Sequence, residues 1–232
     1  MADWATISAL ATAGGTLVLA VATFASVRAG QQAARISERS LLIGMRPVLF
    51  PSRREDPTEK AHFGDGTLLK VPGGTAAVQR GDGGELYFAL ALRNAGAGLA
   101  VIHGWKAVGG RPGIATPDLD GFRNQGLDLY IAAGDSGFWE GALRIPEERD
   151  TDGRADVAAA ISRGDGITID LLYGDFEGGQ RTVSRFWCTP RENAPEWSVG
   201  VLRHWPLDRD APRPDHDAPG APGMPGAPGV TS

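Results

Sequence analysis

The chain has 232 residues, and an apolar stretch near the N-terminus and a Pro/Gly-rich C-terminal stretch leave about 160 residues for one folded domain. Its formal charge of −5 and pI near 5.4 exclude a broadly basic surface of the kind that collects nucleic-acid phosphates. The single cysteine, Cys188, excludes an internal disulfide and a thiolate metal cluster. No nucleic-acid partner is therefore expected, and a reducing compartment suits the chain.

The first predicted element is a membrane-spanning helix. From Ala5 to Val27, 23 consecutive residues carry no charge, and at about 1.5 Å per residue they match a hydrocarbon core about 30 Å thick. Frequent Ala, Thr, Ser and Gly dilute the apolar residues, so a soluble helix stays open as an alternative. A cleaved signal peptide, the other alternative, would have a positive start and a shorter apolar run. The pattern favours a single membrane span.

The charges that flank this span predict its orientation. Nothing basic precedes it, whereas Arg28, Arg35, Arg39 and Arg46 follow it, and such positive flanks stay cytoplasmic. We therefore expect a single-pass protein of the cell membrane whose folded domain faces the cytoplasm. Arg28, Arg35 and Arg39 project within about 40° of one another and are predicted to contact anionic headgroups. An ordinary solvated flank is the alternative interpretation.

Small and hydroxyl side chains share one face of the predicted span. At 100° per residue, seven residues fall within an arc of about 100°; they are Ser8, Thr12, Gly15, Thr16, Leu19, Thr23 and Ser26. Because helices associate in lipid through close packing and hydrogen bonds, this seam predicts self-association or pairing with another membrane protein. The alternative is that the hydroxyls bond to their own helical turn.

Gly44 and Pro47 predict the end of the helix, since Pro47 has no amide hydrogen and biases Arg46 toward extended geometry. Three parts are expected: a transmembrane and juxtamembrane helix over 1–45, a β domain over 46–207, and a disordered Pro/Gly-rich tail over 208–232. Six prolines from Pro212 onward and glycines at every third position from Gly220 resemble a collagen register that is too short to form a triple helix.

The central region predicts short strands separated by glycine-rich turns. Leu86, Phe88, Leu90 and Leu92 alternate with smaller residues, which is typical of a strand with one face toward a core. The predicted strands are Val48–Phe50, Thr67–Val71, Ala76–Gln79, Leu86–Leu92, Ala100–Val108, Leu127–Ala132, Phe138–Leu143, Ile167–Tyr173, Thr182–Cys188 and Trp197–Leu202. Together they predict an antiparallel sandwich or barrel, with an immunoglobulin-like β-sandwich as the favoured fold.

One helix is expected inside the domain, over Asp156–Arg163, with Asp152 or Asp156 capping its start and Gly164 its end. Aromatic side chains are expected to supply much of the core. They are Trp105, Phe138, Trp139, Phe186, Trp187 and Trp197.

Three stretches carry a family resemblance: Arg46-Pro47 after the helix, residues 92–100 (LRNAGAGLA) and residues 172–181 (LYGDFEGGQR). Over about residues 5–205 the chain resembles uncharacterised actinobacterial single-pass membrane proteins with an immunoglobulin-like domain. The resemblance implies architecture and location, and it implies no catalytic or binding residue, because these stretches are turn-forming.

The common signatures of enzyme chemistry are missing from the sequence. The four histidines have no metal-ligand spacing, and there is no nucleophile elbow, phosphate loop or dinucleotide fingerprint. The carboxylates of 150–156 read as a helix cap rather than a calcium loop. Asp175 and Glu177 beside Tyr173 and Arg181 are interpreted as a surface ion-pair cluster. We expect no catalytic residue, cofactor or metal.

These patterns favour a non-enzymatic protein-interaction module at the inner membrane surface, holding a partner by exposed strand edges or loops. The alternative is a ligand sensor or hydrolase with its site in the loops of the sandwich, because fold alone cannot exclude chemistry. A deep pocket with converging polar groups would favour the alternative, and a flat surface with an exposed apolar strip would favour the module. A subunit of a membrane complex is a third possibility.

Overall fold

The computed structural model describes residues 3–111, 113, 115–144 and 153–208. Packing divides the chain into two units, Met1–Gly44 and Met45–Ser232. The chain is mainly antiparallel β structure with one long N-terminal helix, which confirms the predicted fold class at that level. Apart from Asp208, the predicted tail lies outside the described residues.

The N-terminal helix α1 spans Trp4–Gly44 and ends at the predicted glycine. Within its segment Ser8–Glu38 an 18-residue window has a mean hydropathy of 1.8, so α1 is long and apolar enough to cross a membrane. The described side chains of this helix are exposed, including Leu17 at 68% and Leu19 at 70%. A buried helix of a soluble core, the first alternative, would instead hide its apolar face.

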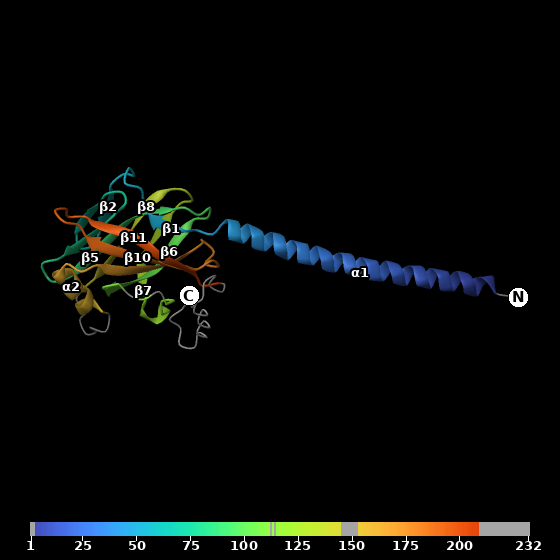
Figure 1. Ribbon diagram of the computed structural model, residues 1–232. Helices are drawn as coiled ribbons and strands as arrows, with labels where there is room; N and C mark the ends of the chain where they lie inside the picture. The colour runs from blue at the N-terminus through green and yellow to red at the C-terminus, as the bar shows by residue number, and fades with distance from the viewer. Residues whose placement is uncertain (1–2, 112, 114, 145–152, 209–232) are drawn as a thin grey trace, which may run out of the picture. The chain divides into compact units, whose positions relative to one another are not determined.

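Nine strands form one curled antiparallel sheet (Figure 1). They are β1 (Leu49–Pro51), β4 (Thr75–Arg80), β5 (Leu86–Asn94), β6 (Ala100–Gly109), β7 (Arg123–Ile131), β8 (Ser136–Leu143), β9 (Ile167–Gly174), β10 (Thr182–Pro190) and β11 (Trp197–Pro206). The order is β1-β5-β4-β11-β10-β9-β6-β7, and β8 pairs with β5. The immunoglobulin-like label is not confirmed, because the strands follow one continuous path instead of two facing sheets.

The main core lies inside the curl of this sheet. Alternation in β5 sends Leu86, Phe88, Leu90 and Leu92 into it, as predicted, while Ala89 and its neighbours face outward. Of the expected aromatic residues, Trp105, Trp139, Phe186 and Trp197 are buried in this core, whereas Phe138 and Trp187 are partly buried.

A hairpin of β2 (Glu59–His62) and β3 (Leu68–Val71) covers the outer face of β5 and β8. It buries Ala61, Phe63, Leu69 and Val71 against residues such as Ala91. Strand β2 was not predicted, because Ala61 is its only apolar residue and no alternation marks it.

Helix α2 (Arg154–Arg163) packs on β6 and β9 through Val157 and Ala160 (Figure 1). Gly164 ends it with a positive φ of 74°, as predicted. The predicted Asp156 cap is wrong: Gly153 stands at the N-cap without a side-chain hydrogen bond, and Asp156 accepts the Gly109 amide instead. Asp152, the other predicted cap, and Asp150 lie outside the described residues.

The turn between β5 and β6 joins the first strand to the rest of the sheet through Asn94. Its Oδ1 accepts the amides of Val48 and Gly96, and its Nδ2 donates to the carbonyls of Gly98 and Ile131. Asn94 is fully buried, and all four of its hydrogen bonds are made. The LRNAGAGLA stretch therefore serves a structural role.

Candidate functional site

The curled sheet does not close by backbone pairing at β7 and β8. Each of these strands has one ladder partner among the described strands, β6 for β7 and β5 for β8. From β8 through the sheet to β7 there are seven pairings of neighbouring strands, and every pairing is antiparallel. Because seven is odd, β7 and β8 run antiparallel to each other. Residues 132–135 join them at one end, and at the other end β7 begins at Arg123 and β8 ends at Leu143.

A bulge interrupts the pairing of β7 with β6 beside this gap. Leu129 pairs with Ile102 and Asn124 pairs with Gly104, so four residues, 125–128, stand opposite His103 alone. Within this bulge Leu127 exposes 67% of its surface.

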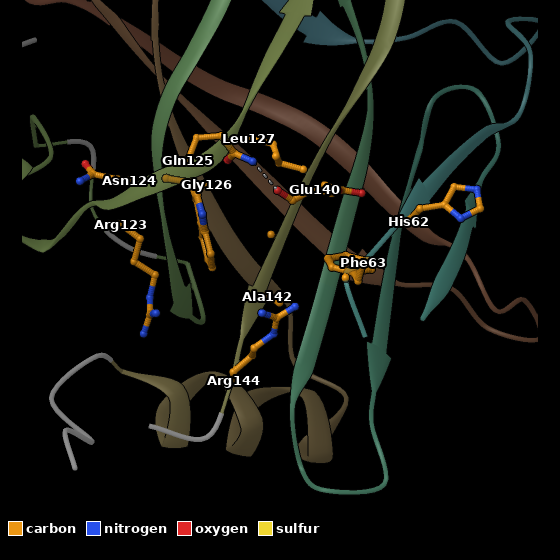
Figure 2. Close-up of a pocket in the computed structure, with 13 residues that line it drawn as sticks. His62, Phe63, Arg123, Asn124, Gln125, Gly126, Leu127, Glu140, Ala142 and Arg144 are labelled. Atoms are coloured by element: carbon orange, nitrogen blue, oxygen red, sulfur yellow. Dashed lines mark hydrogen bonds between the residues drawn. The ribbon is translucent and has the colours of Figure 1, made fainter. Parts of the chain in front are cut away.

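An open groove of about 570 Å³ follows the gap. Its lining comes from four places: residues 123–127 of β7, residues 140–142 and Arg144 at the end of β8, residues 62–64 after β2, and Trp105 of β6. Figure 2 shows Glu140 of β8 between Gln125 on one side and His62 and Phe63 on the other. The floor is small and apolar at Gly141 and Ala142, where a side chain on Gly141 would collide with the rings of Trp105 and Trp139.

The Gln125 side chain bridges the two strands across the groove (Figure 2). Its Nε2 donates to the Glu140 carbonyl at 3.2 Å, and its Oε1 accepts from Trp139 Nε1 at 3.0 Å. One side-chain amide thus contacts β8 where a paired strand would supply peptide groups.

Glu140 is the carboxylate that lines the groove. Burial raises the pKa of Glu140 above its usual value, and the amide and charge of the neighbouring His62 oppose that shift. Its Oε2 is buried and has no hydrogen-bond partner in the structure. Burial of this carboxyl thus acts against its ionised form, relative to an exposed glutamate.

Two arginines line the groove at the end where β7 begins and β8 ends. The Arg123 guanidinium stands 5.7 Å from the centroid of the Trp105 ring. Arg144 is 59% exposed and lies 3.5 Å from Asp65. Hydrogen bonds from Tyr87 and the Thr67 amide lower the pKa of Asp65 to about 2, so this carboxylate stays ionised.

No serine, threonine or cysteine is among the described residues that line the groove. Cys188 is buried, and burial raises the pKa of its thiol far above the usual range. Nor do three or more His, Cys, Asp or Glu side chains gather as metal ligands anywhere in the described parts of the chain.

Two polar clusters lie away from the groove. Arg185 of β10 makes a bidentate ion pair with Asp170 of β9 at 2.7 and 2.8 Å, donates to the Gly113 carbonyl and stacks on the Trp205 ring. Both charged side chains are at least nine-tenths buried. Sequence alone did not indicate this pair.

The second cluster is a buried chain of hydrogen bonds. Tyr173 Oη accepts the Leu49 amide and lies 2.8 Å from Ser184 Oγ, which lies 2.6 Å from His204 Nδ1. Tyr173 therefore does not reach the predicted surface cluster. Asp175 instead accepts the Gly179 amide in that turn.

The predicted residues of the helix seam lie on α1, and their side chains are exposed. Thr12, Thr16 and Thr23 donate to the carbonyls one turn earlier, at 2.8 to 2.9 Å, as in the alternative interpretation. A side chain on Gly15 would meet nothing within 4 Å. Arg28 and Arg35 are exposed, and the side chain of Arg39 is outside what the structure describes. Association and headgroup contact stay predictions.

Comparison with known proteins gave no match, whether to family models, to curated proteins or to solved structures.

The groove residues were not predicted from the sequence. The one signal was local: residues 123–126, Arg-Asn-Gln-Gly, interrupt the apolar alternation, so the predicted strand began at Leu127 instead of Arg123. Such an interruption indicates a bulge or an irregular edge, but it does not say which strand lies across from it.

Proposed function

We propose that the chain is a membrane-anchored, non-enzymatic interaction module that binds another protein through the β7–β8 groove. In this proposal α1 crosses the inner membrane, and the β domain lies on the cytoplasmic side. The exposed apolar surface of α1 and the position of Arg28 and Arg35 after its apolar segment support that arrangement. Membrane confinement would raise the local concentration of partners at the same surface.

The observation that carries the proposal is the pair of facing strand edges in β7 and β8. Strand edges without a ladder partner offer backbone donors and acceptors that readily pair with another chain. The exposed Leu127 adds an apolar contact in the same place. The groove is open to solvent, and no serine, threonine or cysteine nucleophile is among the described residues that line it, which supports the module over a hydrolase.

The same proposal includes the predicted seam of α1 as a surface for pairing with a second membrane helix. The three threonines that bond to their own backbone can still accept hydrogen bonds, and Gly15 leaves space for close approach.

Photo-cross-linking in cells tests the proposal. A photoreactive amino acid at Leu127 should give a cross-linked product of discrete mass, because this side chain lies in the groove. The matched control is Phe176, which is 74% exposed and lies outside the groove. A product from Leu127 that is absent from Phe176 supports the proposal. Equal products from both positions, or none from Leu127, would contradict it.

A further inference from the structure

The backbone of β8 presents hydrogen-bonding groups to the groove. The Glu140 carbonyl accepts from Gln125, so it points away from β5. Because successive residues of an antiparallel strand direct their backbone groups to opposite sides, the backbone groups of Phe138 and Ala142 also point away from β5. These three residues form a regular edge of the kind that pairs with an extended chain.

The β7 wall of the groove also offers backbone hydrogen-bonding groups. Residues 125–128 of β7 have no partners in the ladder with β6. The Gln125 side chain already places an amide between the walls, donating to one group of β8 and accepting from another. A primary amide has the donor and acceptor of a peptide group, so the site already binds this chemistry.

The charges of the groove are unevenly distributed. Arg123 and Arg144 lie where β7 begins and β8 ends, with Arg144 next to the ionised carboxylate of Asp65, whereas Glu140 lies farther along the lining and has a pKa raised by burial. Arg144 is 59% exposed, and its distance of 3.5 Å from Asp65 is longer than a strong charge-assisted hydrogen bond. The arginine end of the groove is therefore electrostatically complementary to a carboxylate of a bound chain.

We propose that the groove accepts an extended peptide as an additional strand between β7 and β8, with acidic residues of that peptide at the Arg123 and Arg144 end. The peptide displaces the Gln125 amide and pairs with both edges. Its apolar side chains pack on Leu127 and the small floor at Gly141 and Ala142. This inference rests on the proposed function, because it specifies how the partner is held.

Selection from a phage-displayed library of short random peptides, panned on the full chain in lipid nanodiscs, tests this binding mode. The recovered peptides should carry Asp or Glu near one end. Their affinity, measured with labelled synthetic peptides, should fall on the order of tenfold for Arg144→Glu. The matched control, Arg163→Glu, changes an arginine that is 60% exposed on α2 and should leave affinity unchanged.

Backbone pairing is tested with the same peptides. N-methylation in the middle of a peptide removes a backbone donor and keeps the side chains, so affinity should fall on the order of tenfold, whereas methylation at an end should have little effect. Recovery of no peptide, enrichment of Lys or Arg, or equal binding after central methylation would overturn the inference. If Leu127 still cross-links to a partner in cells, only this strand mode fails; without that product the proposed function fails too.

Discussion

Asn94 shows how one side chain can organise the start of the domain. It is fully buried, and its side chain hydrogen-bonds backbone groups of Val48 just before β1, of its own turn and of the end of β7. Because β1 is the first strand after α1, these bonds determine where the chain enters the sheet. The residues around Asn94, in the stretch 92–100, thus have a structural role in the fold.

Replacing Asn94 by Asp tests this role. The carboxylate of Asp still accepts the amides of Val48 and Gly96. It cannot donate to the carbonyls of Gly98 and Ile131, so two hydrogen bonds become repulsive contacts between oxygen atoms. We expect the free energy of unfolding to fall by about 3 kcal/mol or more. Urea unfolding followed by tryptophan fluorescence measures it. The control Asn124→Asp, at an exposed position of β7, should change little. A similar loss in both variants would argue against this role for Asn94.

His204 makes stability depend on pH. Burial lowers the pKa of His204, and burial together with the charge of Arg181 lowers the pKa of His103. A histidine with a lowered pKa in the fold binds its proton more weakly than in the unfolded chain. Its contribution to stability is therefore present above about pH 6.5, the unfolded value, and is lost as the pH falls below it.

The variant His204→Asn isolates that contribution. Asn keeps an acceptor near the position of Nδ1 for Ser184 but does not titrate. We expect the loss of unfolding free energy between neutral and mildly acidic pH to be smaller in the variant than in the parent chain, with His103 responsible for part of what remains. Parallel curves for the two proteins would show that His204 does not contribute.

At the scale of elements, the strands could be predicted because their patterns are local. The alternation in β5 and the glycine-rich turns placed ten of the eleven strands near their observed positions. Strand β2 was missed because Ala61 alone marks its buried face. Its place depends on packing against β5 and β8, which only the folded sheet brings into reach.

The candidate site could not be predicted, because it is made by how the sheet curls. Gln125 and Glu140 come from neighbouring strands that do not pair, and nothing in their sequence says that β7 pairs with β6 and leaves β8 to β5. The Asp170–Arg185 ion pair could not be predicted from the sequence either. Each residue interrupts an apolar strand, but their contact depends on the register between β9 and β10.

Removing one partner of this pair should be costly. Asp170→Ala leaves the buried Arg185 guanidinium without its carboxylate, and we expect a loss of about 3–5 kcal/mol in unfolding free energy. The double variant Asp170→Leu, Arg185→Met removes both charges and should recover much of the loss. The exposed pair of Arg163 and Asp165 supplies the control, since Asp165→Ala should cost less than about 1 kcal/mol. A double variant no more stable than Asp170→Ala would contradict this account.

At the scale of the whole molecule, the structure changes which arginines support the predicted orientation. Arg46 had been grouped with the cytoplasmic flank, but it is folded into the β domain, where it donates to Thr182 and pairs with Asp208. Its charge is largely offset there. The prediction of a cytoplasmic domain therefore depends on Arg28, Arg35 and Arg39, which precede the domain.

Membrane insertion of α1 is the central claim, and an alkaline carbonate wash of membranes from cells expressing the full chain tests it most directly. The chain should stay in the membrane pellet and be released by detergent. Leu17→Arg combined with Val21→Arg should weaken insertion, because each arginine costs about 3 kcal/mol at the centre of a span, and should move the protein to the supernatant. An intact parent chain that washes into the supernatant without detergent would contradict the account.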